Sequence, residues 1–100
     1  MQSEKVAPPY SNQIQVSLKK DLKFFTFLSK IYLKEFQEIE LHALGEAISQ
    51  AVKLAESLER SSFAKIIKIN QFLQEMEDDS RKKLKIVIVL TKNKGENGFY

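Results

Sequence analysis

The side chains that could perform catalytic chemistry are few in this sequence. His42 is the single histidine and Cys is absent, so thiolate zinc sites and cysteine nucleophiles are excluded. His42 has no acidic partners at ligand spacing, and we expect an ordinary surface histidine on the polar face of a strand. The acidic residues 75–79 are followed at once by the basic residues 81–83, which favours a solvated, self-neutralising loop over a metal or acid/base site. Because phosphate-binding glycine loops and a G-x-S-x-G elbow are also missing, the sequence predicts no enzyme, no metal and no cofactor.

Lysine and arginine are the other residues with a clear chemistry, because their side chains bind phosphates. The formal net charge is only +3, but the charges are segregated along the chain. Residues 17–34 carry +4 and residues 81–100 carry +5, whereas residues 35–60 and 74–80 each carry −4. If the two basic segments converge in the folded chain, they form an anion-binding face that the small net charge conceals.

Hydrophobic spacing predicts the elements that position these cations. Apolar residues alternate with polar ones over residues 12–17 and again over residues 38–43, as in half-buried strands. Between them, residues 22–36 follow a helical period with a broad apolar face. Asp21 precedes this helix and is well placed to cap it.

The second half of the chain predicts one more helix and two more strands. The helix runs from Gly45, which suits a strand-to-helix turn, to Arg60, and its apolar face is formed by Ile48, Ala51, Val52, Ala55 and Leu58. Residues 64–73 and 84–90 have strand composition, and the second of these is apolar enough for a central strand. The charged residues 74–83 are expected to be a hairpin loop. The resulting order, β-α-β-α-β-β, is a two-layer α+β sandwich.

Chain length and composition are those of one domain, which we place at residues 12–94. Residues 1–11 are expected to be a flexible N-terminal arm and residues 95–100 a flexible tail. A core in 100 residues is marginal, so we expect a partner subunit. No secretion signal and no apolar run of bilayer length is present, and the absence of Cys fits a reduced compartment. We therefore expect no membrane association and an intracellular location, in the cytoplasm, the nucleus or both.

Three segments, taken in order, resemble the Alba family of nucleic-acid binders. They are NQIQVSLKKDLKFFTFLSKIYL, EIELHALGEAISQAVKLAESL and DDSRKKLKIVIVL, and the similarity spans residues 12–92 in register. It is closest to the eukaryotic Alba-like branch. The resemblance implies a mixed four-stranded sheet with strand order 1-2-4-3, and its element order is the one that hydrophobic spacing predicts.

Alba proteins form dimers, and the resemblance implies a nucleic-acid surface built from the loop before the first helix and the arm between the last two strands. The residues that we assign to this surface are Lys19, Lys20, Lys23, Arg81, Lys82, Lys83 and Lys85. Lysine ammoniums and an arginine fork neutralise phosphates and release counterions without reading sequence. Two ordinary interpretations stay open: solvated surface lysines in the loop, and counter-charges to the preceding acidic run for residues 81–83.

The chain also departs from the family pattern. Asp21 stands where relatives usually have Pro, which places a negative charge beside the lysine pair. The arm is several residues shorter than in relatives. Leu44 and Glu46 flank Gly45 where archaeal members carry Arg, and Glu46 would repel phosphate, so we propose no anion site on that helix.

The aromatic residues allow two interpretations as well. Phe24, Phe25 and Phe27 could stack on bases, but their helical spacing favours core packing for at least two of them, with Phe24 the best candidate for exposure. Phe63 matches a position where some relatives present an aromatic ring to a neighbouring dimer, and a core position suits it equally well.

These observations predict a non-enzymatic protein that binds the phosphate backbone of RNA, in preference to duplex DNA, through the basic face of an Alba-like dimer. The RNA preference rests on the eukaryotic resemblance and the short arm. The alternative is a protein-interaction subunit that forms a heterodimer with another Alba-like chain in a ribonucleoprotein of the ribonuclease P or ribonuclease MRP type. The small net charge, Glu46 and the acidic residues 75–79 favour this alternative.

Overall fold

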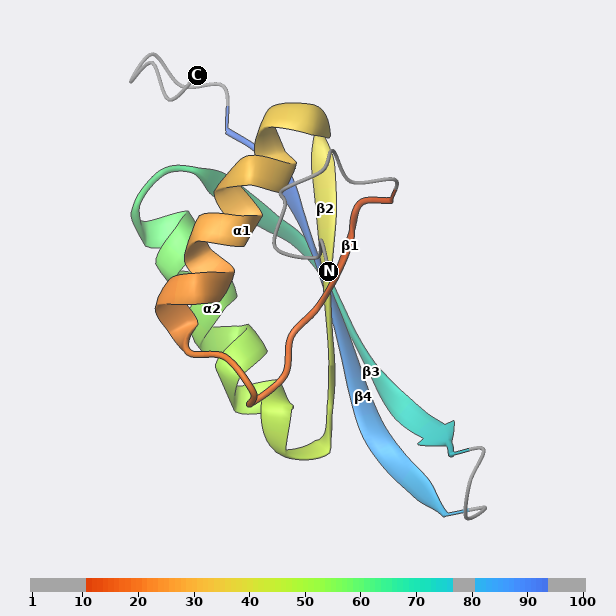
Figure 1. Cartoon of the computed structure of the whole chain (residues 1–100). Helices are drawn as coiled ribbons and strands as arrows, with labels where there is room; N and C mark the ends of the chain where they lie inside the picture. Colours follow the sequence, from red (N-terminus) through yellow and green to blue (C-terminus); the bar gives the residue numbers. More distant parts are fainter. Residues whose placement is uncertain (1–10, 77–80, 94–100) are drawn as a thin grey trace.

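The computed structural model describes residues 11–76 and 81–93, which contain one four-stranded sheet and two α-helices. Both helices lie on the same face of the sheet, so the domain has two layers (Figure 1). The elements in chain order are β1 (Gln13–Gln15), α1 (Leu22–Glu35), β2 (Glu38–Leu44), a 3-10 turn (Gly45–Ala47), α2 (Ile48–Arg60), β3 (Ala64–Glu75) and β4 (Lys82–Lys92). Apart from Ser11, the expected N-terminal arm and C-terminal tail fall outside the described residues.

The sheet has the order β1-β2-β4-β3, which confirms the mixed α+β architecture. β1 pairs with β2 in parallel, while β4 pairs antiparallel with both β2 and β3. The register aligns Ile14, Leu41 and Ile88 in one row across three strands, and all three side chains are buried under the helices. The apolar residues of β1 and β2 therefore lie on the face of the sheet that the helices cover, as their alternation with polar residues predicts.

The helices begin and pack as their sequences dictate. The Asp21 carboxylate accepts a hydrogen bond from the backbone N–H of Phe24 (3.0 Å), which confirms the predicted N-cap of α1. The buried side chains of the two helices are Phe25, Ser29 and Leu33 of α1 and Ala51, Leu54, Ala55 and Leu58 of α2. Together with the inward side chains of the strands they form one continuous core.

Two details of the predicted core are wrong. Of the three phenylalanines at the start of α1, only Phe25 is buried (3% exposed), and Phe27 is more exposed (61%) than Phe24. The helical turn places Phe25 toward the sheet and leaves both neighbours outside the stripe that the sheet covers. On α2, Val52 is exposed and Leu54 takes the inward position, because the buried stripe is centred on Ala51, Leu54, Ala55 and Leu58.

The segment predicted as a loop over residues 74–83 is strand at both of its ends. β3 continues to Glu75 and β4 starts at Lys82, and these two residues pair in the register. A two-stranded ribbon needs only its backbone hydrogen bonds, so charged exposed side chains do not end the strands. Residues 72–76 and 81–85, the hairpin arm from here on, extend past the body of the domain (Figure 1).

Candidate nucleic-acid interface

The lysine pair lies in the loop that joins β1 to α1, and both Lys19 and Lys20 are exposed. Hydrogen bonds fix this loop in place. Within it, the backbone N–H of Lys19 donates to Ser17 Oγ (3.3 Å). From α2, Gln50 Nε2 donates to the carbonyl oxygens of Ser17 (3.0 Å) and Lys20 (2.9 Å). One amide thus ties both ends of the loop to the second helix.

Gln50 is the positioning residue that sequence reasoning missed, because its spacing places it on the polar side of α2. Its partners lie 30 and 33 residues away along the chain. A single glutamine carries no local signal for a contact at that distance, whereas a cap such as Asp21 acts three residues away and is readable in the sequence.

The next two residues shape the charge that this loop presents. The ammonium of Lys20 lies 5.1 Å from the centre of the Phe24 ring, within the range of a cation–π contact. The Asp21 carboxylate is exposed and accepts the hydrogen bond from α1. The negative charge predicted beside the lysine pair is therefore present, and it serves the helix N-terminus.

The cations of the hairpin arm divide between its two faces. Strand alternation places Lys83 and Lys85 on the face that points away from the helices, whereas Lys82 pairs with Glu75 on the opposite face. Arg81 is exposed at the end of the arm, where its carbonyl oxygen accepts from the N–H of Met76 (2.8 Å). The four predicted arm residues therefore do not form one cluster.

Gly45 connects β2 to the helical turn with a positive φ of 54°, which confirms its predicted backbone role. The turn lies next to the part of the hairpin arm that carries Lys83. A Cβ built on Gly45 would lie 3.9 Å from Cδ of Lys83, so the lysine stem runs over the glycine at van der Waals distance. Lys83 therefore lies beside the end of β2.

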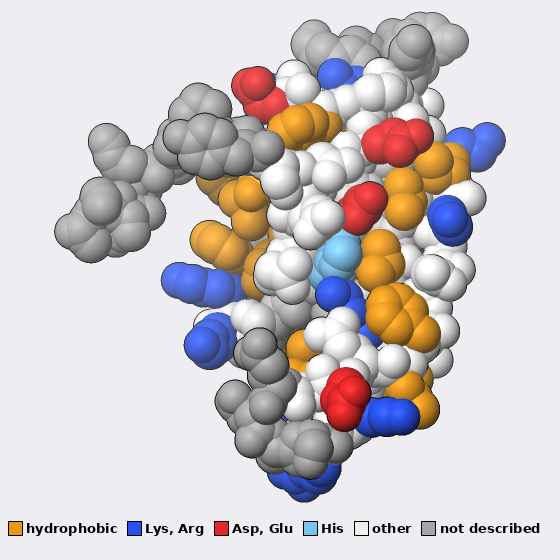
Figure 2. Space-filling model, turned by 90° about the vertical axis from the view of Figure 1, so that its right-hand side faces the viewer, with side chains coloured by type: hydrophobic (Ala, Val, Ile, Leu, Met, Phe, Trp, Pro, Cys, Tyr) orange, Lys and Arg blue, Asp and Glu red, His pale blue; other side chains and the backbone are white. Residues whose placement is uncertain are grey.

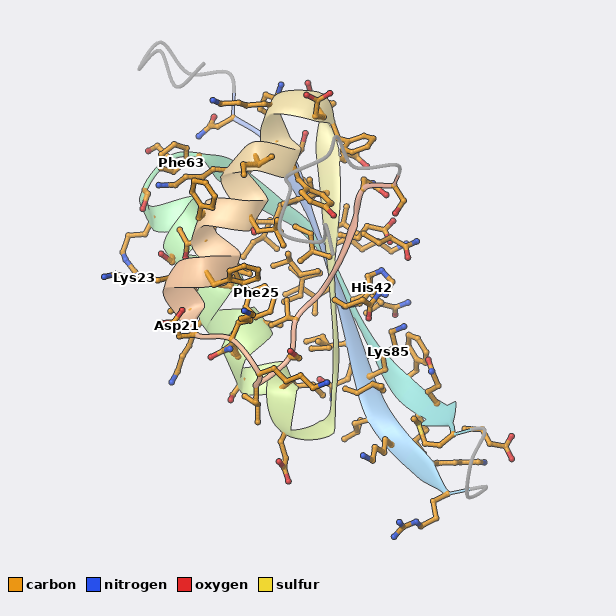
Figure 3. All side chains as sticks on the ribbon, viewed as in Figure 1. Asp21, Lys23, Phe25, His42, Phe63 and Lys85 are labelled. Atoms are coloured by element: carbon orange, nitrogen blue, oxygen red, sulfur yellow. The ribbon has the colours of Figure 1, made fainter. Side chains whose placement is uncertain are left out.

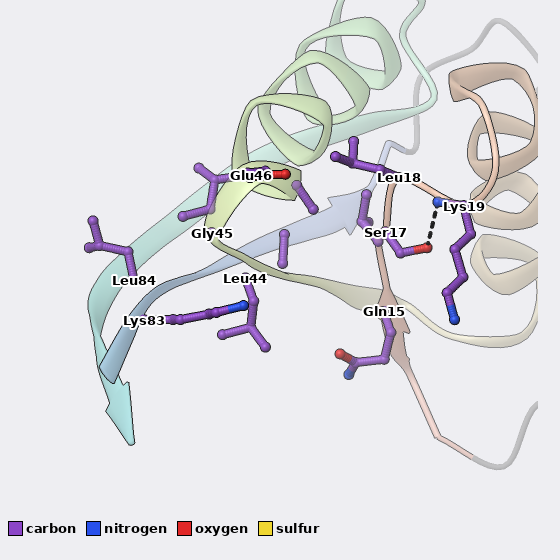
Figure 4. A pocket seen from close by; sticks show the side chains of 13 residues that line it. Gln15, Ser17, Leu18, Lys19, Leu44, Gly45, Glu46, Lys83 and Leu84 are labelled. Carbon is purple, nitrogen blue, oxygen red and sulfur yellow. Dashed lines mark hydrogen bonds between the residues drawn. The ribbon is translucent and has the colours of Figure 1, made fainter. Parts of the chain in front are cut away.

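The structure brings the loop and the arm together at this end of the sheet. An open hollow of about 1040 Å³ is lined by Lys19 from the loop and by Lys83 from the arm, and Gly45 lines it beside Lys83 (Figure 4). Two cations separated by 64 positions thus border one depression. Glu46 also lines it and is exposed, so the hollow carries one negative charge beside its two positive ones.

The remaining predicted site residues are not all part of this group. Lys23 lies on the outer side of α1, and Figure 3 shows it on the opposite side of the molecule from Lys85. Lys85 is half-buried on the open face of the sheet. Asp78, Asp79 and Ser80, which precede Arg81 in the family pattern, fall outside the described residues.

His42 differs from its predicted character. It lies on the polar side of β2 as expected, but it is buried (8% exposed) and is not a surface histidine. Its Nε2 is 2.9 Å from Glu40 Oε1, and its Nδ1 is buried without a hydrogen-bond partner within residues 11–76 and 81–93. A side chain on an uncovered sheet face can be buried by branched or long side chains of the neighbouring strand. Val87, the branched cross-strand partner on β4, lies beside His42 in this way.

No group of three or more metal-ligating side chains is found among the described residues. In the same part of the chain, no helix has both the length and the apolar character needed to cross a bilayer.

Comparison with known proteins gives consistent matches. The profile of the Alba family matches residues 12–74. Over 87 residues the chain is 40% identical to the uncharacterized protein At2g34160 of Arabidopsis thaliana, an alignment that covers 82% of this chain and 67% of that protein.

Two solved structures share the fold. The crystal structure of ALBA1 from Trypanosoma brucei superposes with a TM-score of 0.79 at 29% identity, covering 92% of this chain and 78% of that one. Alba from Thermoplasma volcanium superposes with a TM-score of 0.65 at 28% identity, covering 81% of this chain and the whole of that one.

Proposed function

The chain belongs to the Alba family of nucleic-acid-binding proteins, and from this premise we propose that it binds the phosphate backbone of RNA, in preference to duplex DNA, as an Alba-like dimer. The protein acts by binding and has no catalytic role. Its loop cations Lys19 and Lys20 and its arm cations Lys83 and Arg81 contact phosphates.

The observation that carries this proposal is the hollow bordered by both Lys19 and Lys83. A polyanion laid across it meets cations from two separate elements, and each contact releases counterions. Gln50 fixes the loop, so less ordering of the loop is needed when the ligand binds. Lys23 lies away from this group and contributes only to the general field.

An exposed apolar surface supports the dimer. On the helix-facing side of β3 and β4, Leu73 and Leu84 are direct cross-strand partners and both are exposed, as is Ile69 further along β3. Exposed apolar side chains grouped on one face are typical of protein interfaces. A second copy packed there buries them and doubles the cations through two-fold symmetry.

Light scattering tests the dimer. The full chain should have twice the monomer mass of 11.6 kDa, and Leu73→Asp should shift it to the monomer. Gln74→Asp, which adds the same charge on the other face of the strand, should remain dimeric. A dimer that survives Leu73→Asp would move the interface elsewhere.

A salt titration tests the phosphate contacts. The affinity for a single-stranded RNA is measured at several salt concentrations for the native chain and for Lys19→Ala/Lys20→Ala. For each phosphate contact that the variant loses, the slope of log K against log salt should become less steep by about 0.7. The control Lys34→Ala/Lys53→Ala removes the same charge from exposed helical positions and should change the slope less. Equal slopes for the native chain and the loop variant would remove the loop from the interface.

Glu46 favours a second candidate function, in which a different Alba-like chain supplies most RNA contacts and this chain is the interaction subunit of a ribonucleoprotein. The carboxylate borders the hollow next to the two lysines and repels phosphate there. Under this alternative the purified chain fails to bind single-stranded RNA at physiological salt, and binding recovers when an Alba-like partner is added.

A further inference from the structure

The face of the sheet that points away from the helices is open to solvent. The register sets its side chains in rows across the strands: Gln15, His42, Val87 and Asn70 form one row, and Leu44, Lys85 and Phe72 form the next. Figure 2 looks onto this side and shows the histidine at its centre with hydrophobic side chains beside it. The open face is therefore a mixed surface, neither an apolar patch nor a purely charged one.

Phe72 is the aromatic residue of this face. It lies on β3 directly opposite Lys85 and is 41% exposed, although Phe is a residue that folding usually buries. The half-buried Val87 lies one row along, on the same face as the ring. The ring lies on the open face and is only partly covered, so part of its surface is free for a base to stack on.

The charged side chains that the structure describes next to the ring on this face are lysines. Lys85 is its cross-strand partner, and Lys83 lies two residues before Lys85 on the same face of β4. From the row of His42 to the row of Lys83, the described residues of the open face include no carboxylate. The one nearby acid on this side of β2, Glu40, lies a row further on and is paired with His42.

We propose that Phe72 stacks on an unpaired base, so that the open face binds single-stranded nucleic acid with Lys83 and Lys85 at the flanking phosphates. An exposed ring beside two cations matches a polyanion that also offers free base faces, and a duplex does not offer them because its bases are already stacked. This inference rests on the proposed function and adds to it a contact that depends on the base and not on the phosphate.

The chain contains no Trp, so a single Phe72→Trp substitution makes a specific fluorescent reporter. Oligouridylate of ten nucleotides should quench the fluorescence of this variant, whereas an abasic oligonucleotide of the same length should bind without quenching. Phe27→Trp is the control, because that ring is exposed on α1 in the helical layer and should not be quenched.

Affinity measurements with dye-labelled oligouridylate complete the test. Phe72→Leu keeps an apolar side chain and should lower affinity about 5- to 150-fold without changing the salt slope, and Phe72→Tyr should restore most of it. Binding without quenching at position 72, or an unchanged affinity in Phe72→Leu, overturns the stacking role and leaves the phosphate contacts intact. If the native chain does not bind either oligonucleotide, the proposed function fails as well.

Discussion

β2 and β3 pair with the two sides of the same strand, β4, yet their surroundings are opposite. The inward residues of β2, such as Ile39 and Leu41, are completely buried. β3 is buried at Ala64 but carries Ile69 and Leu73 exposed on the surface. Both strands are rich in apolar residues, so composition alone does not distinguish a strand that stabilises the fold from one that is available to a partner.

The same contrast applies to the cations. The loop with Lys19 and Lys20 is fixed to the body by Gln50, whereas the arm that carries Lys83 is a two-stranded ribbon outside the core. A ribbon without a packed face can adjust its twist at little cost. We infer that the loop provides contacts at fixed positions and that the arm adapts to the ligand.

The largest expected effect on the free energy of unfolding comes from replacing a leucine by alanine in each of the two strands, β2 and β3. Leu41→Ala leaves a cavity under the helices and should lower the free energy of unfolding by about 2–5 kcal/mol. Leu73→Ala, at a position 61% exposed, should change it by about 0.5 kcal/mol or less in dilute, monomeric protein. Urea denaturation followed by circular dichroism measures both. Similar decreases for the two variants would mean that the arm is part of the folded core.

A smaller effect should follow when the loop is released from the body. Gln50→Ala removes two hydrogen bonds to carbonyl groups and should cost about 1–2 kcal/mol of stability. It should also weaken RNA binding, although no charge is removed, because the lysine loop is no longer ordered in advance. Ser49→Ala, at the exposed neighbouring position, is the control for the stability of α2. Unchanged RNA affinity in Gln50→Ala would show that the loop binds without this anchor.

Gln50 illustrates where sequence reasoning stops. Periodicity located both helices and four strands, and the cap at Asp21 and the turn at Gly45 followed from local chemistry. These features depend on residues a few positions apart. The convergence of Lys19 with Lys83 was an expectation that only the folded chain could test, because it depends on strand order and on how the arm crosses Gly45.

The errors have the same origin. Phe27 and Val52 have the spacing of core residues but lie just outside the stripe that the sheet covers. Glu75, Lys82 and Lys83 were predicted to lie in a loop because they are charged, yet an exposed ribbon does not need a buried face. His42 is polar in sequence and buried in the structure, because β4 supplies Val87 beside it. In each case the surroundings, and not the residue type, decide exposure.

The Asp21 carboxylate has two roles, as the cap of α1 and as a negative charge beside Lys20, and two substitutions distinguish them. Asp21→Ala removes the cap of α1 and should lower the free energy of unfolding by about 1 kcal/mol, whereas Asp21→Asn keeps a capping oxygen and should leave stability nearly unchanged. Both variants remove the negative charge beside Lys20, so both should bind RNA more tightly than the native chain at low salt, and the difference should shrink as salt is added. Thermal unfolding and RNA titration measure the two roles. If neither variant gains affinity, the carboxylate does not oppose the lysine pair.

The smallest expected effect concerns the ring under Lys20. The ammonium lies 5.1 Å from the centre of the Phe24 ring, and an exposed cation–π contact contributes about 0.5–1 kcal/mol. A double-mutant cycle of Phe24→Leu with Lys20→Ala should give a coupling of that size in thermal unfolding, since the cycle cancels the loss of the edge contact between Phe24 and Phe25, which is the same with and without Lys20. The matching cycle with Phe27→Leu should give no coupling. Zero coupling at Phe24 would mean that the ring does not restrain the Lys20 side chain. The difference between a fixed loop and an adaptable arm would then apply to the backbone and not to the side chains.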